Sequence, residues 1–274
     1  MRALAPIVTV LVLLVVLTIL VNAMKRSTLF FPSRFPEGRW ETSHLPLQPV
    51  DVTIPVKSDV AIHGWLFQAV DPRAPLLIWS HGNGGNITNR APAASELASR
   101  GCSVLLYDYR GYGKSGGQPG EQILYGDALA VYDFAVQHRF ADASAIISYG
   151  ESLGGPYAAY LASRRPVRAV VIENSFHSAA SVANAIYRVP IGVFLGQSLS
   201  TARFLNRAKV PVLIMHGRLD EVIPLRAALD LHESLDVPVE LWLVEQARHS
   251  ELSRVDGYYE KVIEFSRRGN QKRE

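Results

Sequence analysis

IISYGESLGG, residues 146–155, joins a short apolar run to the pattern G-x-S-x-G, and residues 156–164 then permit a helix. Gly150 and Gly154 flank Ser152 at the spacing of a sharp strand-to-helix turn, because a side chain at either position would crowd that turn. The pattern also occurs by chance. Its meaning therefore depends on whether the chain supplies a base, an acid, an oxyanion site and a parallel sheet in a compatible order.

Composition narrows the class of protein. The chain has 274 residues, of which 48% are hydrophobic and 19% charged, and this suits one α/β domain. A net charge of +3 without a block of Lys or Arg gives no electrostatic footprint for nucleic acid, so no nucleic-acid partner is expected. The single cysteine, Cys102, lies in an apolar run and is predicted to be a buried strand residue rather than a catalytic thiol.

The N-terminus contains a long apolar segment. Residues 3–24 carry no charge, and 22 residues of helix would span about 33 Å, enough to cross a bilayer core of about 30 Å. Residues 1–26 are therefore predicted to be a transmembrane anchor that makes the chain a single-pass membrane protein. The alternative is a cleaved signal peptide and a secreted protein, because residues 21–23 offer a cleavage site. Balanced flanking charges leave the orientation in the membrane open.

A connector separates this segment from the predicted domain. Residues 27–49 are rich in Pro, Ser and aromatic residues and are predicted to be extended, with the aromatic side chains on the domain or at the membrane interface. The domain is predicted to span residues 50–268 and to be followed by a short tail, residues 269–274.

Hydrophobic periodicity predicts the architecture of the domain. Short apolar runs alternate with longer stretches of helical spacing, which favours a mostly parallel eight-stranded sheet with helices on both faces. The predicted strands are 50–56, 60–70, 76–79, 102–107, 145–148, 169–172, 212–215 and 239–244. The predicted helices are 90–99, 121–139, 152–164, 224–235 and 255–265. In such an α/β sheet, chemistry is expected at the carboxyl ends of the strands.

One insertion, about residues 177–209, interrupts this alternation. It has no strand pattern but contains several apolar side chains. It is either a surface helical excursion or a small apolar cap over the active site. The cap is favoured, because exposed apolar side chains need something to cover.

A serine hydroxyl needs a base to accept its proton. Among eight histidines, His249 follows the last predicted strand by a short loop, at a carboxyl end, and is the first candidate. His177, at the start of the insertion, is the second candidate.

The base in turn needs an acid to hold its tautomer. Asp220 lies in the loop after strand 212–215, ahead of Pro224, which suits the first turn of a helix. This gives the chain order Ser152, Asp220, His249. Glu173 and Asp108 also end strands and remain alternatives.

Acyl transfer requires two donors for the oxyanion of the tetrahedral intermediate. One candidate is the backbone N–H of Leu153, next to the serine. The other is Asn83, in the loop SHGNGGN at residues 80–86, whose glycines allow a ligand to approach the backbone closely. The alternative is that this loop is an ordinary glycine-rich turn.

Four motifs together resemble those of α/β-hydrolase fold serine hydrolases of the compact, membrane-anchored type: HGNGGN (81–86), DYRGYGKSG (108–116), GESLGG (150–155) and HGRLD (216–220). The resemblance covers residues 50–265. It implies Ser152 as nucleophile, His249 as base, Asp220 as acid, Asn83 and Leu153 as oxyanion donors, and no metal or organic cofactor. Arg248 departs from the family, which often has glycine before the histidine.

The predicted activity is cleavage of carboxylic esters or thioesters through an acyl-enzyme on Ser152. The substrate would be a small-molecule ester or acyl compound, and the anchor and cap favour a lipid-like one. Two other functions remain open: an amidase or peptidase with the same triad, and a non-catalytic binding protein on the same fold. Peptidases of this fold usually carry an extra domain or larger cap, for which the chain has no room.

Overall fold

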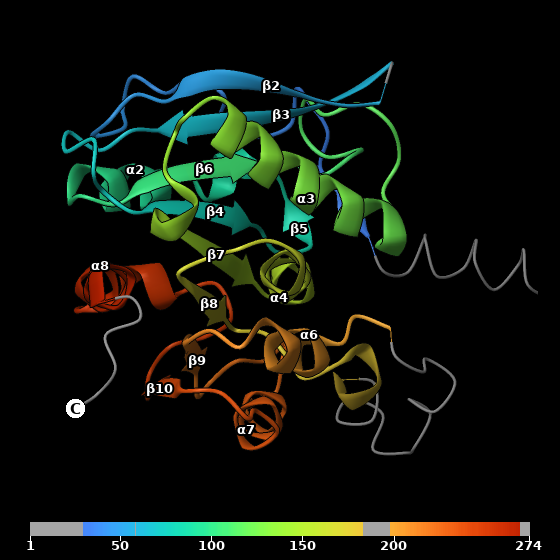
Figure 1. Ribbon diagram of the computed structural model, residues 1–274, viewed down its shortest axis with the longest axis vertical. Helices are drawn as coiled ribbons and strands as arrows, with labels where there is room; N and C mark the ends of the chain where they lie inside the picture. The colour runs from blue at the N-terminus through green and yellow to red at the C-terminus, as the bar shows by residue number, and fades with distance from the viewer. Residues whose placement is uncertain (1–29, 58, 183–197, 269–274) are drawn as a thin grey trace, which may run out of the picture.

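The computed structural model describes residues 30–57, 59–182 and 198–268. Its main sheet has eight strands in the order β10-β9-β8-β7-β4-β6-β3-β2 (Figure 1). Within this sheet β3 runs antiparallel to both of its neighbours and the other pairs are parallel, so the predicted mostly parallel eight-stranded sheet is confirmed. The strands are β2 (Val50–Lys57), β3 (Val60–Phe67), β4 (Leu76–Ser80), β6 (Ser103–Tyr107), β7 (Ile146–Glu151), β8 (Ala169–Glu173), β9 (Val212–Gly217) and β10 (Val239–Val244).

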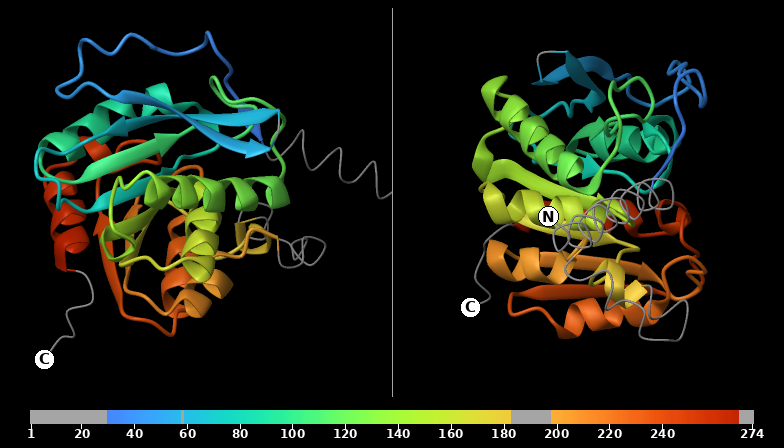
Figure 2. Two further views of the ribbon diagram at one scale, coloured as in Figure 1. Left: turned by 45° about the horizontal axis from the view of Figure 1, so that its top comes forward. Right: turned by 90° about the vertical axis from the view of Figure 1, so that its right-hand side faces the viewer.

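Helices cover both faces of the sheet. One apolar cluster holds side chains of α3 (Glu121–Gln137), α4 (Gly154–Arg164), α6 (Thr201–Ala208) and α7 (Leu225–Glu233). The opposite cluster holds side chains of α2 (Ala91–Ser99) and α8 (Tyr258–Arg268). The right-hand view of Figure 2 shows α3, α4 and α6 on one side of the strands and α2 and α8 on the other.

The central strands are mostly apolar because they are covered on both faces. Strands β4, β6, β7, β8 and β9 are buried along their whole length. Successive residues of β4 enter opposite clusters: Ile78 packs with α3 and α4, whereas Trp79 packs with α2 and α8. Cys102, just before β6, is buried as predicted.

Two helices begin two or three residues later than predicted. The predicted helix 152–164 begins at Gly154, because Ser152 has a φ of 51° and lies outside the right-handed helical region. The predicted helix 255–265 is replaced by a short 3₁₀ turn, Leu252–Arg254, and by α8, which begins at Tyr258. Gly257, with a φ of 83°, separates the two.

The predicted connector docks on the domain through a pairing that the sequence did not predict. Its residues Phe31–Pro32 form β1, which pairs in parallel with β5 (Gly84–Gly85) as a separate two-stranded sheet. Farther along, the Trp40 ring packs 5.4 Å from the Trp65 ring, centroid to centroid. The predicted anchor, residues 1–26, and the predicted tail lie outside the described residues. Among the helices that are described, none has the length and apolarity to span a bilayer.

The predicted cap is only partly described, because residues 183–197 lie outside the described ranges. Its later part forms α6. The ring of Phe204 on α6 packs against Tyr125 of α3 and Tyr160 of α4, with centroids 5.5 and 5.1 Å apart. This part of the insertion therefore covers helices rather than the site of Ser152.

Candidate active site

Ser152 occupies a strained turn between β7 and α4. Its φ of 51° is left-handed, a conformation that costs a residue with a side chain about 1–2 kcal/mol. Both of its backbone groups are held: the N–H donates to the carbonyl of Glu173 at 2.8 Å, and the carbonyl accepts from Ser175 Oγ at 2.7 Å. Surrounding hydrogen bonds therefore maintain a geometry that the chain alone would not favour.

The two flanking glycines are required by close packing. A Cβ atom at Gly150 would lie 2.6 Å from the carbonyl oxygen of Gly154. A Cβ at Gly154 would lie 1.9 Å from the carbonyl oxygen of Ser80, at the end of β4. The start of α4 thus sits directly on the neighbouring strand, which leaves Ser152 at the carboxyl edge of the sheet.

The structure brings Ser152, His249 and Asp220 together from three separate loops. His249 Nε2 lies 3.0 Å from Ser152 Oγ, and His249 Nδ1 lies 2.7 Å from Asp220 Oδ2. Asp220 Oδ1 accepts the backbone N–H groups of Val222 and Ile223 at 2.9 and 2.7 Å, which fixes the carboxylate. The three groups form a continuous hydrogen-bonded array that ends at the serine hydroxyl.

Asn174 positions the histidine loop. Its Nδ2 donates to the carbonyl of His249 at 2.5 Å, and its Oδ1 accepts the N–H of Gly217 at 2.9 Å. This residue was not among those predicted from the sequence. The signal that could have found it is a polar residue directly after a buried strand, β8. Arg248, the departure from the family pattern, is exposed and donates its backbone N–H to Glu251.

The surroundings of His249 favour its protonated form. Burial alone would lower its pKa, but the hydrogen bond and negative charge of Asp220 outweigh burial and raise the pKa above its ordinary value of 6.5. A histidine in this position can accept a proton from the serine, and the carboxylate can stabilise the imidazolium that results.

The alternative acids, Glu173 and Asp108, and the alternative base, His177, form their hydrogen bonds with other groups. Glu173 Oε2 accepts hydrogen bonds from the hydroxyls of Tyr149 and Tyr258, and burial raises its pKa to about 7. Asp108 is buried and accepts the N–H of Ile87 at 3.0 Å. His177 Nδ1 contacts Ser178 Oγ at 3.3 Å.

Both predicted oxyanion donors have an available backbone N–H. Within the described ranges, neither Asn83 N–H nor Leu153 N–H has an intramolecular acceptor. The Asn83 side chain is held in place, because its Oδ1 accepts Phe31 N–H at 3.0 Å and Tyr112 O–H at 2.9 Å. Asn83 and Ser152 line the same cavity.

A buried ion pair ties the glycine-rich loop to the serine turn. Arg90 Nε and Nη2 donate to the two carboxylate oxygens of Glu151 at 2.9 and 2.7 Å. Arg90 Nη1 also donates to the carbonyl of Gly84 at 2.7 Å. Burial alone would raise the pKa of Glu151, but the charge of Arg90 lowers it to about 2. No role was predicted for this pair from the sequence.

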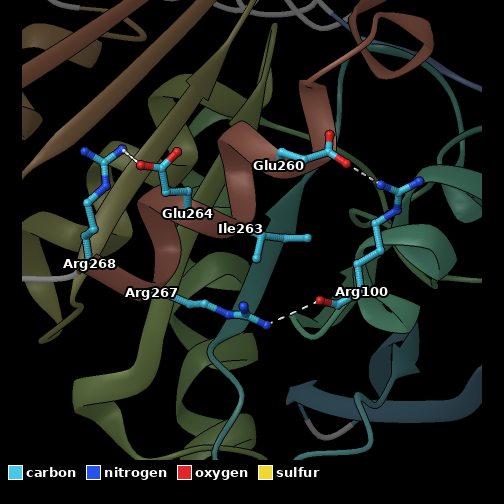
Figure 3. Close-up of a pocket in the computed structure, with 6 residues that line it drawn as sticks. All are labelled: Arg100, Glu260, Ile263, Glu264, Arg267 and Arg268. Carbon is cyan, nitrogen blue, oxygen red and sulfur yellow. Dashed lines mark hydrogen bonds and ion pairs between the residues drawn. The ribbon is translucent and has the colours of Figure 1, made fainter.

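The cavity beside Ser152 has a volume of about 640 Å³. Its walls combine apolar, aromatic and charged side chains, among them Phe31, Trp79, Arg90, Glu173, Val222 and Tyr258. A second hollow of about 620 Å³ lies between the end of α2 and α8 (Figure 3). Its charged groups pair with one another, as Arg100 does with Glu260 and Arg268 with Glu264. The first cavity, which contains Ser152 and His249, is therefore the candidate active site.

Comparison with known proteins identifies the family of the chain. Residues 71–195 match the family described as serine aminopeptidase, S33. The chain is 32% identical to α/β hydrolase domain-containing protein 17B of Xenopus tropicalis, over 73% of this chain and 69% of that protein. The chain belongs to the α/β-hydrolase family.

Two further comparisons extend over more of the chain. An uncharacterized protein of Mycobacterium tuberculosis is 31% identical, over 86% of this chain and 84% of that one. The structure of an esterase from Pyrococcus furiosus superposes with a TM-score of 0.68 at 19% identity, over 87% of this chain and 96% of that one. This α/β hydrolase has an eight-stranded sheet flanked by helices. It thus shares its fold with a known esterase.

Proposed function

We propose that this α/β hydrolase cleaves carboxylic esters or thioesters with Ser152 as nucleophile. The observation that carries the proposal is the hydrogen-bonded array from Asp220 through His249 to the hydroxyl of Ser152. A serine hydroxyl becomes nucleophilic only when a base receives its proton, and this array supplies that base.

The reaction follows from the array. Ser152 Oγ attacks the substrate carbonyl carbon while His249 Nε2 takes the hydroxyl proton, and a tetrahedral oxyanion forms. The backbone N–H groups of Asn83 and Leu153 are proposed to donate to that oxyanion. Collapse breaks the bond to the leaving group, which receives the proton from His249 and leaves an acyl ester on Ser152. Water, deprotonated by His249, then releases the acid.

The cavity mouth favours an apolar substrate. Phe31 and Val222 line the cavity, and their side chains are 59% and 48% exposed. Exposed apolar groups at a binding site gain free energy when an apolar ligand covers them. We therefore propose an acyl-chain or lipid-like ester or thioester. The proposed membrane anchor over residues 1–26 would bring the domain close to such substrates.

Labelling with a fluorophosphonate probe tests the nucleophile. The wild-type protein and Ser152→Ala are compared with Ser253→Ala, which removes another serine that lines the cavity. Wild type and Ser253→Ala should label, and Ser152→Ala should not. Equal labelling of Ser152→Ala would refute the assignment, and a wild-type protein that neither labels nor hydrolyses esters would favour a non-catalytic binding protein.

A substrate panel separates the activity classes. p-Nitrophenyl esters of increasing chain length, acyl-CoA thioesters and aminoacyl p-nitroanilides are compared with one enzyme preparation. A preference for long acyl chains would support the lipid-like substrate. Faster cleavage of the anilides would instead favour an aminopeptidase, the activity for which the matching family is described.

Membrane attachment has its own test. If residues 1–26 form an uncleaved anchor, the full-length chain should stay with membranes through an alkaline carbonate wash, and mass spectrometry should find its N-terminal peptide. Release of a shorter chain that begins after residue 23 would show a cleaved signal peptide instead.

A further inference from the structure

The segment that leads into the domain is attached directly to the predicted oxyanion loop. Strand β1 pairs Phe31 with Gly84 and Pro32 with Gly85. The side chain of Asn86 donates to the carbonyl of Ser33 at 3.2 Å. Backbone pairing and a side-chain hydrogen bond therefore attach the N-terminal segment to the loop that carries Asn83.

The same segment also contacts a second loop. Phe35 N–H donates to the carbonyl of Gly113 at 2.9 Å, and Gly113 N–H donates to the carbonyl of Ser33 at 2.9 Å. Tyr112, next to Gly113, donates its hydroxyl to Asn83 Oδ1 at 2.9 Å. Residues 31–35 thus bridge two loops at the edge of the cavity.

Asn83 needs such external contacts because its own loop is intrinsically loose. Its neighbours Gly82 and Gly84 carry no side chain, and a Cβ at Gly84 would meet nothing within 4 Å. Glycine has more backbone freedom than any other residue, so this loop gains little order from its own sequence. The order comes from outside contacts, which include the pairing of β5 with β1, the two hydrogen bonds at Asn83 Oδ1 and the Arg90 contact with Gly84.

The orientation of the Asn83 amide follows from its partners. A backbone N–H can only donate, so the atom 3.0 Å from Phe31 N must be the amide oxygen. With Oδ1 held on the side of Phe31 and Tyr112, the position of the Asn83 side chain is fixed, and with it the direction of the adjoining backbone.

We infer that Phe31 has two separable roles in the proposed reaction. Its backbone N–H positions Asn83, so that the Asn83 N–H is held toward the oxyanion, and its exposed ring contacts the apolar part of the substrate. This inference rests on the proposed function of Ser152. It assigns a residue outside the predicted domain, 50–268, to the active site.

Two substitutions at one position separate the roles. Phe31→Pro removes both the N–H and the ring, and Phe31→Ala removes the ring alone, so the difference between the two variants reports on the N–H. Phe31→Pro should lower kcat about 10-fold or more on a two-carbon ester and change KM less than about twofold. Complete loss of one oxyanion donor lowers kcat about 10²–10³-fold, and Phe31→Pro misplaces the Asn83 donor without removing it. Phe31→Ala should keep kcat on the two-carbon ester and raise KM for a long-chain ester about fivefold, and Phe31→Leu should restore that KM.

Tyr112→Phe guards against misfolding of the proline variant. It removes the other donor to Asn83 Oδ1 and leaves the backbone unchanged, so it should lower kcat in the same way as Phe31→Pro, without a change in chain-length preference. Val70→Ala, which trims an exposed apolar side chain that does not line the cavity, is the control and should leave both constants unchanged.

The outcomes distinguish this inference from the proposed function. If the wild-type full-length enzyme labels at Ser152 but Phe31→Pro and Tyr112→Phe keep kcat within twofold, the positioning role is refuted. If Phe31→Ala leaves the chain-length profile unchanged, the role of the ring is refuted. If the wild type does not label at Ser152, the proposed function itself is wrong.

Discussion

The buried pair of Arg90 and Glu151 should make a large and pH-dependent contribution to stability. Glu151→Gln keeps the shape of the side chain and removes its charge. The pKa of Glu151 is lowered from 4.5 to about 2, and a difference of that size corresponds to about 3 kcal/mol of unfolding free energy at pH 7. Breaking one partner of a buried ion pair typically costs about 3–5 kcal/mol, in the same range.

The sign of the pH dependence follows from the lowered pKa. A carboxyl group whose folded pKa lies below its unfolded pKa stabilises the fold above pH 4.5, and this contribution disappears as the pH falls toward 2. The difference in stability between wild type and Glu151→Gln should therefore be largest at pH 7 and should shrink below pH 4.5.

Urea denaturation followed by tryptophan fluorescence measures this difference. Glu264→Gln is the matched control, because it breaks the exposed ion pair with Arg268 and should cost less than about 1 kcal/mol. A loss below about 1 kcal/mol for Glu151→Gln at pH 7, or a loss that is the same at pH 3 and pH 7, would refute the reasoning.

Three further predictions concern the same region. The rate of ester hydrolysis should fall as the pH drops through a value above 6.5, because His249 must be neutral to act as base and its pKa is raised. A stopped assay across pH 5–9 measures this rate, and an inflection below pH 6.5 would contradict the prediction. Gly154→Ala should abolish soluble, active protein, since its Cβ would lie 1.9 Å from Ser80 O, whereas Gly84→Ala should still give folded protein by circular dichroism. Glu173→Gln should become more stable than wild type by up to about 3 kcal/mol as the pH rises from 5 to 8, because a buried carboxyl whose pKa is raised from 4.5 to about 7 lowers the stability of the fold between those two pH values, where only the unfolded chain ionises readily; equal pH dependence of the two melting curves would contradict this.

The sequence predicted the fold and the central residues of the site because both rest on local patterns. Short apolar runs that alternate with helical spacing define parallel strands, and the carboxyl ends of such strands meet at one edge. Ser152, Asp220 and His249 each follow a strand, in the chain order of the family, so their convergence follows once the sheet is predicted.

The residues that support the site were harder to predict. Arg90 and Glu151 are 61 positions apart, and no periodicity connects a residue before one helix with the end of a distant strand. Strand β1 has two residues, too few for an alternating pattern. The choice of Asp220 over Glu173 also depends on three-dimensional detail. Glu173 is the last residue of β8 and Asp220 lies in the loop after the neighbouring strand β9, and only the structure shows which carboxylate contacts His249.

The attachment of Phe31 to the rim of the cavity would also limit how far the proposed anchor lets the site lie from a bilayer. Phe31 follows Met24, the last residue of the uncharged segment, by seven residues, and seven fully extended residues reach at most about 25 Å. With the proposed anchor in place, the entrance to the cavity is tethered within that distance of the membrane surface. Such an enzyme would encounter substrate by lateral diffusion in two dimensions, and its rate would follow the surface density of substrate rather than the bulk concentration.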